Sequence, residues 1–156
     1  MAARTPQPRF LLAALAALFL VACGEKPTTL EDLNATEVIF PNGTKIMAET
    51  MRGQIELLRG MMFRDSLANG RGMLLAYPRE GNYPCWMYQT RIPLDVIWID
   101  HEHRIVEISA ATPPCPSKSA KECPTFGGNQ KAMFVLEVNS GIAAKNGLGV
   151  GRMLTF

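Results

Sequence analysis

Residues 94–109 read Leu94-Asp95-Val96-Ile97-Trp98-Ile99-Asp100-His101-Glu102-His103-Arg104-Ile105-Val106-Glu107-Ile108-Ser109. Two apolar runs rich in β-branched and aromatic residues flank the polar segment 100–104. That composition is typical of two strands joined by a tight turn. The sequence therefore predicts a β-hairpin over this stretch.

Short apolar runs separated by turn residues continue on both sides of the hairpin. Two short helices are also predicted, the first with Thr50 as N-cap and Ile55 and Leu58 on its apolar face, the second with Ser140 as N-cap. This pattern predicts a mainly β domain of the α+β class, compact and barrel-like or sandwich-like, with about two short helices. The further predicted strands are 38–40, 45–49, 72–77, 85–88, 133–139 and 152–156, and the helices are 51–59 and 140–146.

The chain has 156 residues, which is room for one domain with one core. It is 47% hydrophobic and 19% charged, so it is too apolar to be disordered. Its formal net charge is +2, and two of its arginines lie in the N-terminal segment discussed next. Without a basic cluster the sequence lacks the charge pattern of a nucleic-acid-binding protein, so no nucleic-acid partner is predicted.

The N-terminus has the pattern of an export signal. Arg4 and Arg9 precede an apolar run at residues 10–22, which ends in small residues before Cys23. The run is shorter than the roughly 20 residues that a membrane-spanning helix needs, so a transmembrane anchor is the less favoured interpretation. Residues 1–22 are therefore predicted to be a signal peptide.

The segment Leu20-Val21-Ala22-Cys23 resembles a bacterial lipobox, in which the cysteine is lipidated and becomes the first residue of the mature protein. Acyl chains would attach the protein to a membrane of the cell envelope, facing the periplasm or the exterior. Gly24, where an Asp would mark inner-membrane retention, favours the outer membrane. An ordinary cleaved signal remains the alternative. Residues 23–36 are predicted to be the anchor and a flexible tether, and residues 37–156 the single domain.

Export places the remaining cysteines in an oxidising compartment, where a disulfide bond is expected. Cys115 and Cys123 lie in a Pro-rich stretch and are the preferred pair, although three cysteines allow three single pairings. Cys85 is then the odd thiol, read as a small buried apolar residue or, alternatively, as a reactive or metal-binding group.

One set of residues resembles the domain-of-unknown-function 192 family, and the match extends from about residue 37 to 156. The resemblance implies a compact, strand-dominated, barrel-like domain that often occurs on exported or anchored bacterial proteins, and it implies no established activity. The sequence departs from the family pattern at Cys85, where an aromatic residue is usual, at Tyr88-Gln89 and at Arg152. The motifs that carry the resemblance are Gly60-Met61-Met62-Phe63-Arg64, Trp86-Met87, Ile92-Pro93-Leu94-Asp95 and residues 135–138.

Asp95 stands at the start of a strongly apolar strand, so its carboxylate needs a charged or hydrogen-bonding partner. Arg64 and Arg91 are the expected partners, because a guanidinium group binds a carboxylate with two hydrogen bonds. Asp95, Arg64, Trp86 and Thr90 then form the rim of a binding pocket with Arg91 close by. The alternative is a buried structural pair.

Two further observations leave alternatives open. Glu137 lies on the same strand face as Val135, so an exposed position is at least as favoured as an inward one. The methionine-rich composition and Cys85 suggest a soft-metal site, but methionines also fill irregular cores, and this second interpretation is preferred. No metal or other cofactor is predicted.

Enzyme motifs such as Gly-x-Ser-x-Gly and His-Glu-x-x-His are absent from the sequence. The favoured function is a membrane-anchored binding or interaction module whose partner is a small ligand or an envelope protein. An envelope enzyme of unrecognised, hydrolase-like type that uses Asp95 and Arg64 is the first alternative. A structural role or soft-metal handling is the second.

Overall fold

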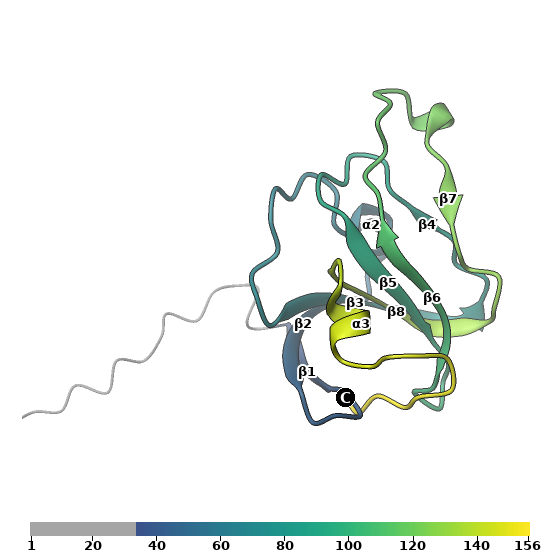
Figure 1. Ribbon diagram of the computed structural model, residues 1–156. Helices are drawn as coiled ribbons and strands as arrows, with labels where there is room; N and C mark the ends of the chain where they lie inside the picture. Colours follow the sequence, from purple (N-terminus) through teal and green to yellow (C-terminus); the bar gives the residue numbers. More distant parts are fainter. Residues whose placement is uncertain (1–33) are drawn as a thin grey trace, which may run out of the picture.

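The structure, a computed structural model, describes residues 34–156, so the predicted signal peptide, Cys23 and most of the tether lie outside the described residues. Within these described residues, eight strands form a six-stranded sheet of order β1-β2-β3-β8-β5-β6 and a two-stranded sheet of β4 and β7. The prediction of a β-rich α+β fold with two short helices is confirmed (Figure 1). The elements are β1 (Ala35–Ile39), β2 (Lys45–Met51), α2 (Gln54–Arg59), β3 (Arg71–Gly81), β4 (Cys85–Trp86), β5 (Leu94–Ile99), β6 (Ile105–Thr112), the 3-10 helix η1 (Ala120–Glu122), β7 (Thr125–Phe126), β8 (Ala132–Asn139) and α3 (Ile142–Lys145). No helix among residues 34–156 is long and apolar enough to cross a membrane.

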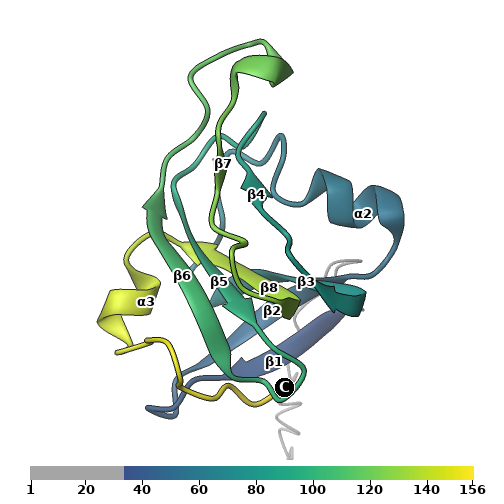
Figure 2. The same ribbon diagram turned by 90° about the vertical axis from the view of Figure 1, so that its right-hand side faces the viewer.

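The six-stranded sheet is strongly curved but does not close on itself within the described residues. β2 and β3 pair in parallel and all other neighbours pair antiparallel. Figure 2 shows β5 and β6 crossing the other strands at a steep angle. The segment after α3 passes between the two sheet edges, where Thr155 pairs with Ile39 and Met153 with Arg104. The predicted strand 152–156 is therefore only two isolated bridges, because the segment crosses the gap instead of running along one edge.

Both faces of the central strands are buried. All six residues of β5 are buried, as expected for a strand covered on both sides. Ile97 and Ile99 belong to one apolar cluster, with Val38, Leu136 and Leu154. Val96 and Trp98 belong to a second cluster on the other face. The sheet therefore separates two cores.

The second core lies between the sheet and the β4–β7 pair. The fully buried Trp98 donates a hydrogen bond from Nε1 to the carbonyl oxygen of Tyr83 at 2.7 Å. Gly127 passes directly over the indole at a φ of +55°, and a Cβ at that position would collide with the ring. Only glycine combines this backbone conformation with such close approach. β7 was not predicted, because its two residues carry no periodic signal of their own.

The predicted N-terminus and buried face of the first helix are wrong. Thr50 is buried in β2, where it pairs with Leu74 of β3, and the N-cap is Gly53. Ile55 and Leu58 are 82% and 71% exposed. The strand continues through the expected cap, so the helix is only a short connection between two parallel strands. The second helix likewise begins after Gly141 and not after Ser140.

Candidate functional site

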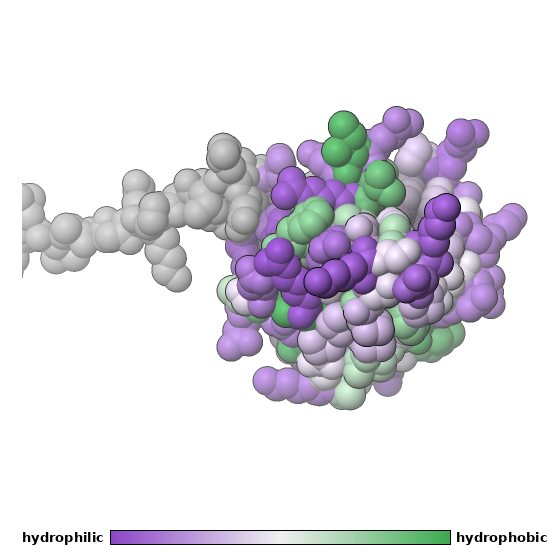
Figure 3. All heavy atoms as spheres, turned by 90° about the horizontal axis from the view of Figure 1, so that it is seen from above, coloured by the Kyte–Doolittle hydropathy of each residue, from purple (hydrophilic) through white to green (hydrophobic). Residues whose placement is uncertain are grey.

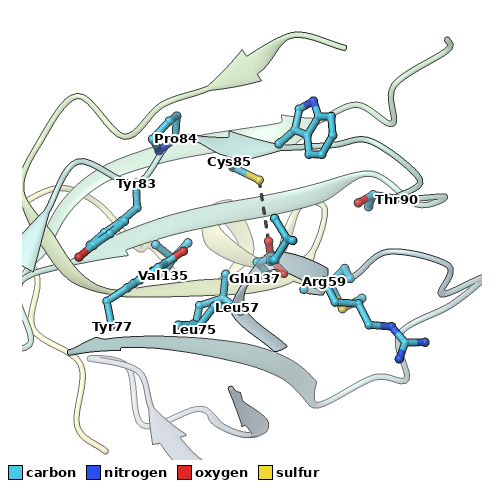
Figure 4. A pocket seen from close by; sticks show the side chains of 14 residues that line it. Leu57, Arg59, Leu75, Tyr77, Tyr83, Pro84, Cys85, Thr90, Val135 and Glu137 are labelled. Atoms are coloured by element: carbon cyan, nitrogen blue, oxygen red, sulfur yellow. Dashed lines mark hydrogen bonds between the residues drawn. The ribbon is translucent and has the colours of Figure 1, made fainter. Parts of the chain in front are cut away.

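A cavity of about 310 Å³ lies on the second core face, between α2, β3, β4 and β8. Its walls are mainly apolar and aromatic: Leu57 comes from α2, Tyr77 from β3, and Tyr83 precedes β4. The rings of Tyr77 and Tyr83 are stacked, with their centroids 3.5 Å apart. Burial raises the pKa of Tyr77 to about 12, with a smaller contribution from Glu137, so its hydroxyl stays protonated at neutral pH. Figure 4 shows these side chains around the carboxylate of Glu137.

Glu137 is the unusual group of this cavity. It stands on β8, is only 5% exposed, and its Oε2 atom is buried without a hydrogen-bond partner in the described part of the chain. Burial raises its pKa from 4.5 to about 7, and the hydrogen bond from the Cys85 thiol and the positive charge of Arg64 oppose that shift. A buried polar atom without a partner is costly, so this oxygen marks a place where a ligand atom would be stabilised.

Cys85 contacts the same carboxylate. Its Sγ lies 3.8 Å from Glu137 Oε1 and 3.7 Å from the thioether sulfur of Met87. Burial raises the pKa of the Cys85 thiol far above its usual range, and the charge of Glu137 adds to the effect. The group is therefore a protonated thiol at neutral pH, which is a poor nucleophile.

The predicted site residues do not all meet. Trp86 and Thr90 line the cavity with Cys85 and Glu137. Arg64 instead makes a two-pronged ion pair with Glu49, at 2.6 and 2.7 Å, and Arg91 pairs with Asp65 at 2.7 Å. The expected pairing of Asp95 with Arg64 or Arg91 is therefore wrong.

Asp95 is bound by backbone groups. It is 1% exposed. Its Oδ1 accepts a hydrogen bond from the N–H of Ala111 at 2.9 Å, and its Oδ2 accepts one from Ala143 at 2.8 Å. The carboxylate thus ties the end of β6 and the start of α3 to β5. This arrangement matches the structural alternative for Asp95, with backbone amides in place of an arginine.

The preferred disulfide bond is confirmed. Cys115 and Cys123 are joined, and Cys85 is the free cysteine among residues 34–156. The N–H of Cys115 also donates to the carbonyl oxygen of Met87 at 3.3 Å. This hydrogen bond attaches the disulfide loop to Met87, which follows the cavity-lining residues Cys85 and Trp86 in the chain. The lipidation of Cys23 stays a prediction, because that residue lies outside the described part.

Sequence reasoning missed the convergence of Cys85 and Glu137. Strand alternation correctly placed Glu137 on the face of Val135, but that face is covered by the second core and is not exposed to solvent. A carboxylate in the otherwise apolar run 134–138 was the available signal. The aromatic walls could not be predicted, because they depend on how β3 and β4 are placed.

The fold and the site define a small β-rich domain with an apolar cavity that contains one buried carboxylate. The chain belongs to the domain-of-unknown-function 192 family, described as uncharacterized, whose model matches residues 37–156. The comparison with curated proteins found no match.

Two solved structures are similar to this chain. A protein of unknown function from Novosphingobium aromaticivorans is 26% identical, with a TM-score of 0.65 over 78% of this chain and 84% of that chain. A protein described as a putative transcription regulator from Sinorhizobium meliloti is 24% identical, with a TM-score of 0.66 over 76% of this chain and 89% of that one. The second likeness concerns the fold alone.

The backbone contacts of Asp95 predict a stability effect. In Asp95→Asn, one side-chain atom becomes a donor and opposes a backbone N–H, so the free energy of unfolding should fall by about 1–3 kcal/mol. Urea unfolding measures the change. Asp65→Asn, at the exposed end of the Arg91 ion pair, is the control and should cost less than about 1 kcal/mol. Equal stability of Asp95→Asn and the wild type would contradict the structural role.

The buried carboxylate of Glu137 predicts a pH dependence of stability. Its folded-state pKa is about 7, against an ordinary value of 4.5, so the folded protein holds this proton more tightly than the unfolded chain. The stabilisation is complete below about pH 4.5 and is lost as the pH rises through 7, by up to roughly 3 kcal/mol. Unfolding of the wild type and Glu137→Gln at pH 5 and pH 8 measures it. The variant should lose less stability than the wild type over this range, and parallel profiles would count against a buried, titrating Glu137.

Proposed function

We propose that this protein is an exported, lipid-anchored binding module that holds a small ligand in the cavity beside Glu137. The observation that carries the proposal is that Glu137 lines the cavity while its buried Oε2 atom has no hydrogen-bond partner among the described residues. A ligand that places a hydrogen-bond donor or a positive charge at this oxygen would remove the cost of its burial.

The shape of the site supports binding by a small ligand. A cavity of about 310 Å³ lies at the lower end of the usual range for small-molecule sites, and apolar walls with few polar groups are typical of such sites. Trp86 and Thr90, both predicted from the sequence, belong to this wall. Arg59 also lines the cavity, but its side chain extends away from the Glu137 carboxylate (Figure 4).

The arrangement favours binding over catalysis. The Cys85 thiol is held in its protonated form by burial. Both oxygens of Asp95 accept backbone hydrogen bonds, and Arg64 is paired with Glu49. The hydrolase-like alternative that uses Asp95 with Arg64 therefore finds no support in the geometry.

Helix α2 forms one wall of the cavity and is loosely held. None of its residues is buried, while Leu57 packs against the second core and lines the cavity. Figure 3 shows hydrophobic side chains projecting among hydrophilic ones on the face seen from above. Such a helix can move outward at small cost, because few buried apolar contacts are lost. We propose this wall as the entrance for the ligand.

The proposed lipid anchor is supported by the sequence. The lipobox-like segment that ends at Cys23 and the polar residues after it support attachment to an envelope membrane, with the domain in the periplasm or at the exterior. From residue 23 to residue 34 the chain can span at most about 40 Å. The domain would therefore stay close to the membrane and meet ligands or envelope proteins there.

Ligand binding in the cavity predicts a retained mass. Native mass spectrometry of the full-length protein purified from its own membrane should show an added mass on the wild type. Leu57→Trp, which fills the cavity from α2, should lose it. Ile55→Trp, on the exposed side of the same helix, is the matched control and should keep it. An added mass that survives in Leu57→Trp, or no added mass on the wild type, would count against the proposal.

Lipid anchoring predicts a change of phase. In Cys23→Ala no acyl chain can be attached, so the protein should move from the detergent phase to the aqueous phase or accumulate as an uncleaved precursor. Detergent-phase partition of cells producing each form measures this. Normal cleavage with unchanged membrane retention would rule out the anchor without affecting the cavity.

A further inference from the structure

Two further donor atoms lie beside the thiol of Cys85, which lines the cavity. The thiol sulfur of Cys85 lies 3.7 Å from the thioether sulfur of Met87 and 3.8 Å from Glu137 Oε1. Four-coordinate ions bonded to sulfur at about 2.3 Å hold neighbouring ligand atoms about 3.8 Å apart. The separations from Cys85 to its two neighbours are thus those of donors around a common ion.

From this juxtaposition we propose that Cys85, Met87 and Glu137 bind a thiophilic monovalent cation, Cu(I) or its analogue Ag(I). The inference rests on the proposed function of the cavity. It identifies the positively charged ligand beside Glu137 as a metal cation. It uses the carboxylate of Glu137, whose Oε1 faces the Cys85 thiol and whose Oε2 has no partner among the described groups, in addition to the two sulfur atoms.

The donor set selects the class of ion. Thioether and thiolate ligands favour Cu(I), whereas zinc sites in proteins are built from thiolates, imidazoles and carboxylates. Within the described residues, no group of three or more His, Cys, Asp and Glu side chains could hold a metal ion, so a site of the ordinary zinc type is not available there. Binding exchanges the S–H bond of Cys85 for a bond from the thiolate sulfur to the ion and releases the proton to solvent. No electron is transferred.

The backbone holds the two sulfur residues in place. The carbonyl oxygen of Met87 accepts hydrogen bonds from Thr90 at 3.2 Å and from Cys115 at 3.3 Å. Cys85 pairs with Phe126 in the β4–β7 sheet. The donors are therefore preorganised, which lowers the ordering cost of binding. Cys85 and Glu137 line the cavity, so an ion has a path to them.

A titration of full-length protein with Ag(I), and with Cu(I) under ascorbate against a chromogenic Cu(I) chelator, tests the proposal. The wild type should bind one ion in the cavity. Cys85→Ser should weaken binding at least about 100-fold, and Met87→Leu and Glu137→Gln about 10-fold each. Met73→Leu is the matched control, because Met73 is buried in the same core as Met87 and is not one of the three proposed donors, and it should bind as the wild type does. Undiminished binding by Cys85→Ser would contradict the site.

X-ray absorption of the Cu(I)-loaded wild type provides a second measurement that does not depend on the folding of the variants. Two sulfur scatterers in addition to a light atom are expected. One sulfur alone, equal affinity of Met87→Leu and Met73→Leu, or preference for Zn²⁺ would overturn the three-donor site. An organic mass in the cavity without Cu(I) or Ag(I) affinity would overturn this inference and leave the proposed function intact. Neither mass nor ion would overturn both.

Discussion

The burial of Trp98 beneath the backbone of the β4–β7 region is the contact on which the second half of the structure depends. The indole donates to the carbonyl of Tyr83, and Gly127 lies against its ring. These two contacts hold a separate two-stranded layer over a sheet that would otherwise expose one apolar face. The cavity lies beside this layer, so its walls at Tyr83, Cys85 and Trp86 are positioned by a residue that does not line it.

The strands could be predicted where their own composition determines them. The hairpin 94–109 and the run 133–139 are apolar and β-branched, and both form strands close to their predicted bounds. The order of the sheet depends on distant pairing, since β8 lies between β3 and β5. The buried face of α2 was mispredicted for a related reason. Periodicity reports which residues of a helix share a face, and it cannot report whether the fold covers that face with other residues.

In the candidate site too, features determined by local sequence were predicted, whereas features determined by distant contacts were not. The Cys115–Cys123 bond was preferred from local spacing and export chemistry, and Trp86 and Thr90 were selected as site residues that the structure places in the cavity wall. The partner of Asp95 was mispredicted, because a carboxylate needs donors of any kind and the fold supplies two backbone amides in place of an arginine. Glu137 was placed on the correct strand face. Its burial depends on the second layer, which adds a cover that strand periodicity cannot show.

The pairing of Ile39 with Thr155 bears on the order in which the molecule is completed during synthesis. The buried Leu154 belongs to the first core together with Val38. The contacts of β1 are therefore complete only when residues 154 and 155 have been synthesised. Contacts between positions so distant in the chain form late and slowly. A ribosome-bound chain that lacks these residues therefore lacks the contacts that complete its first core.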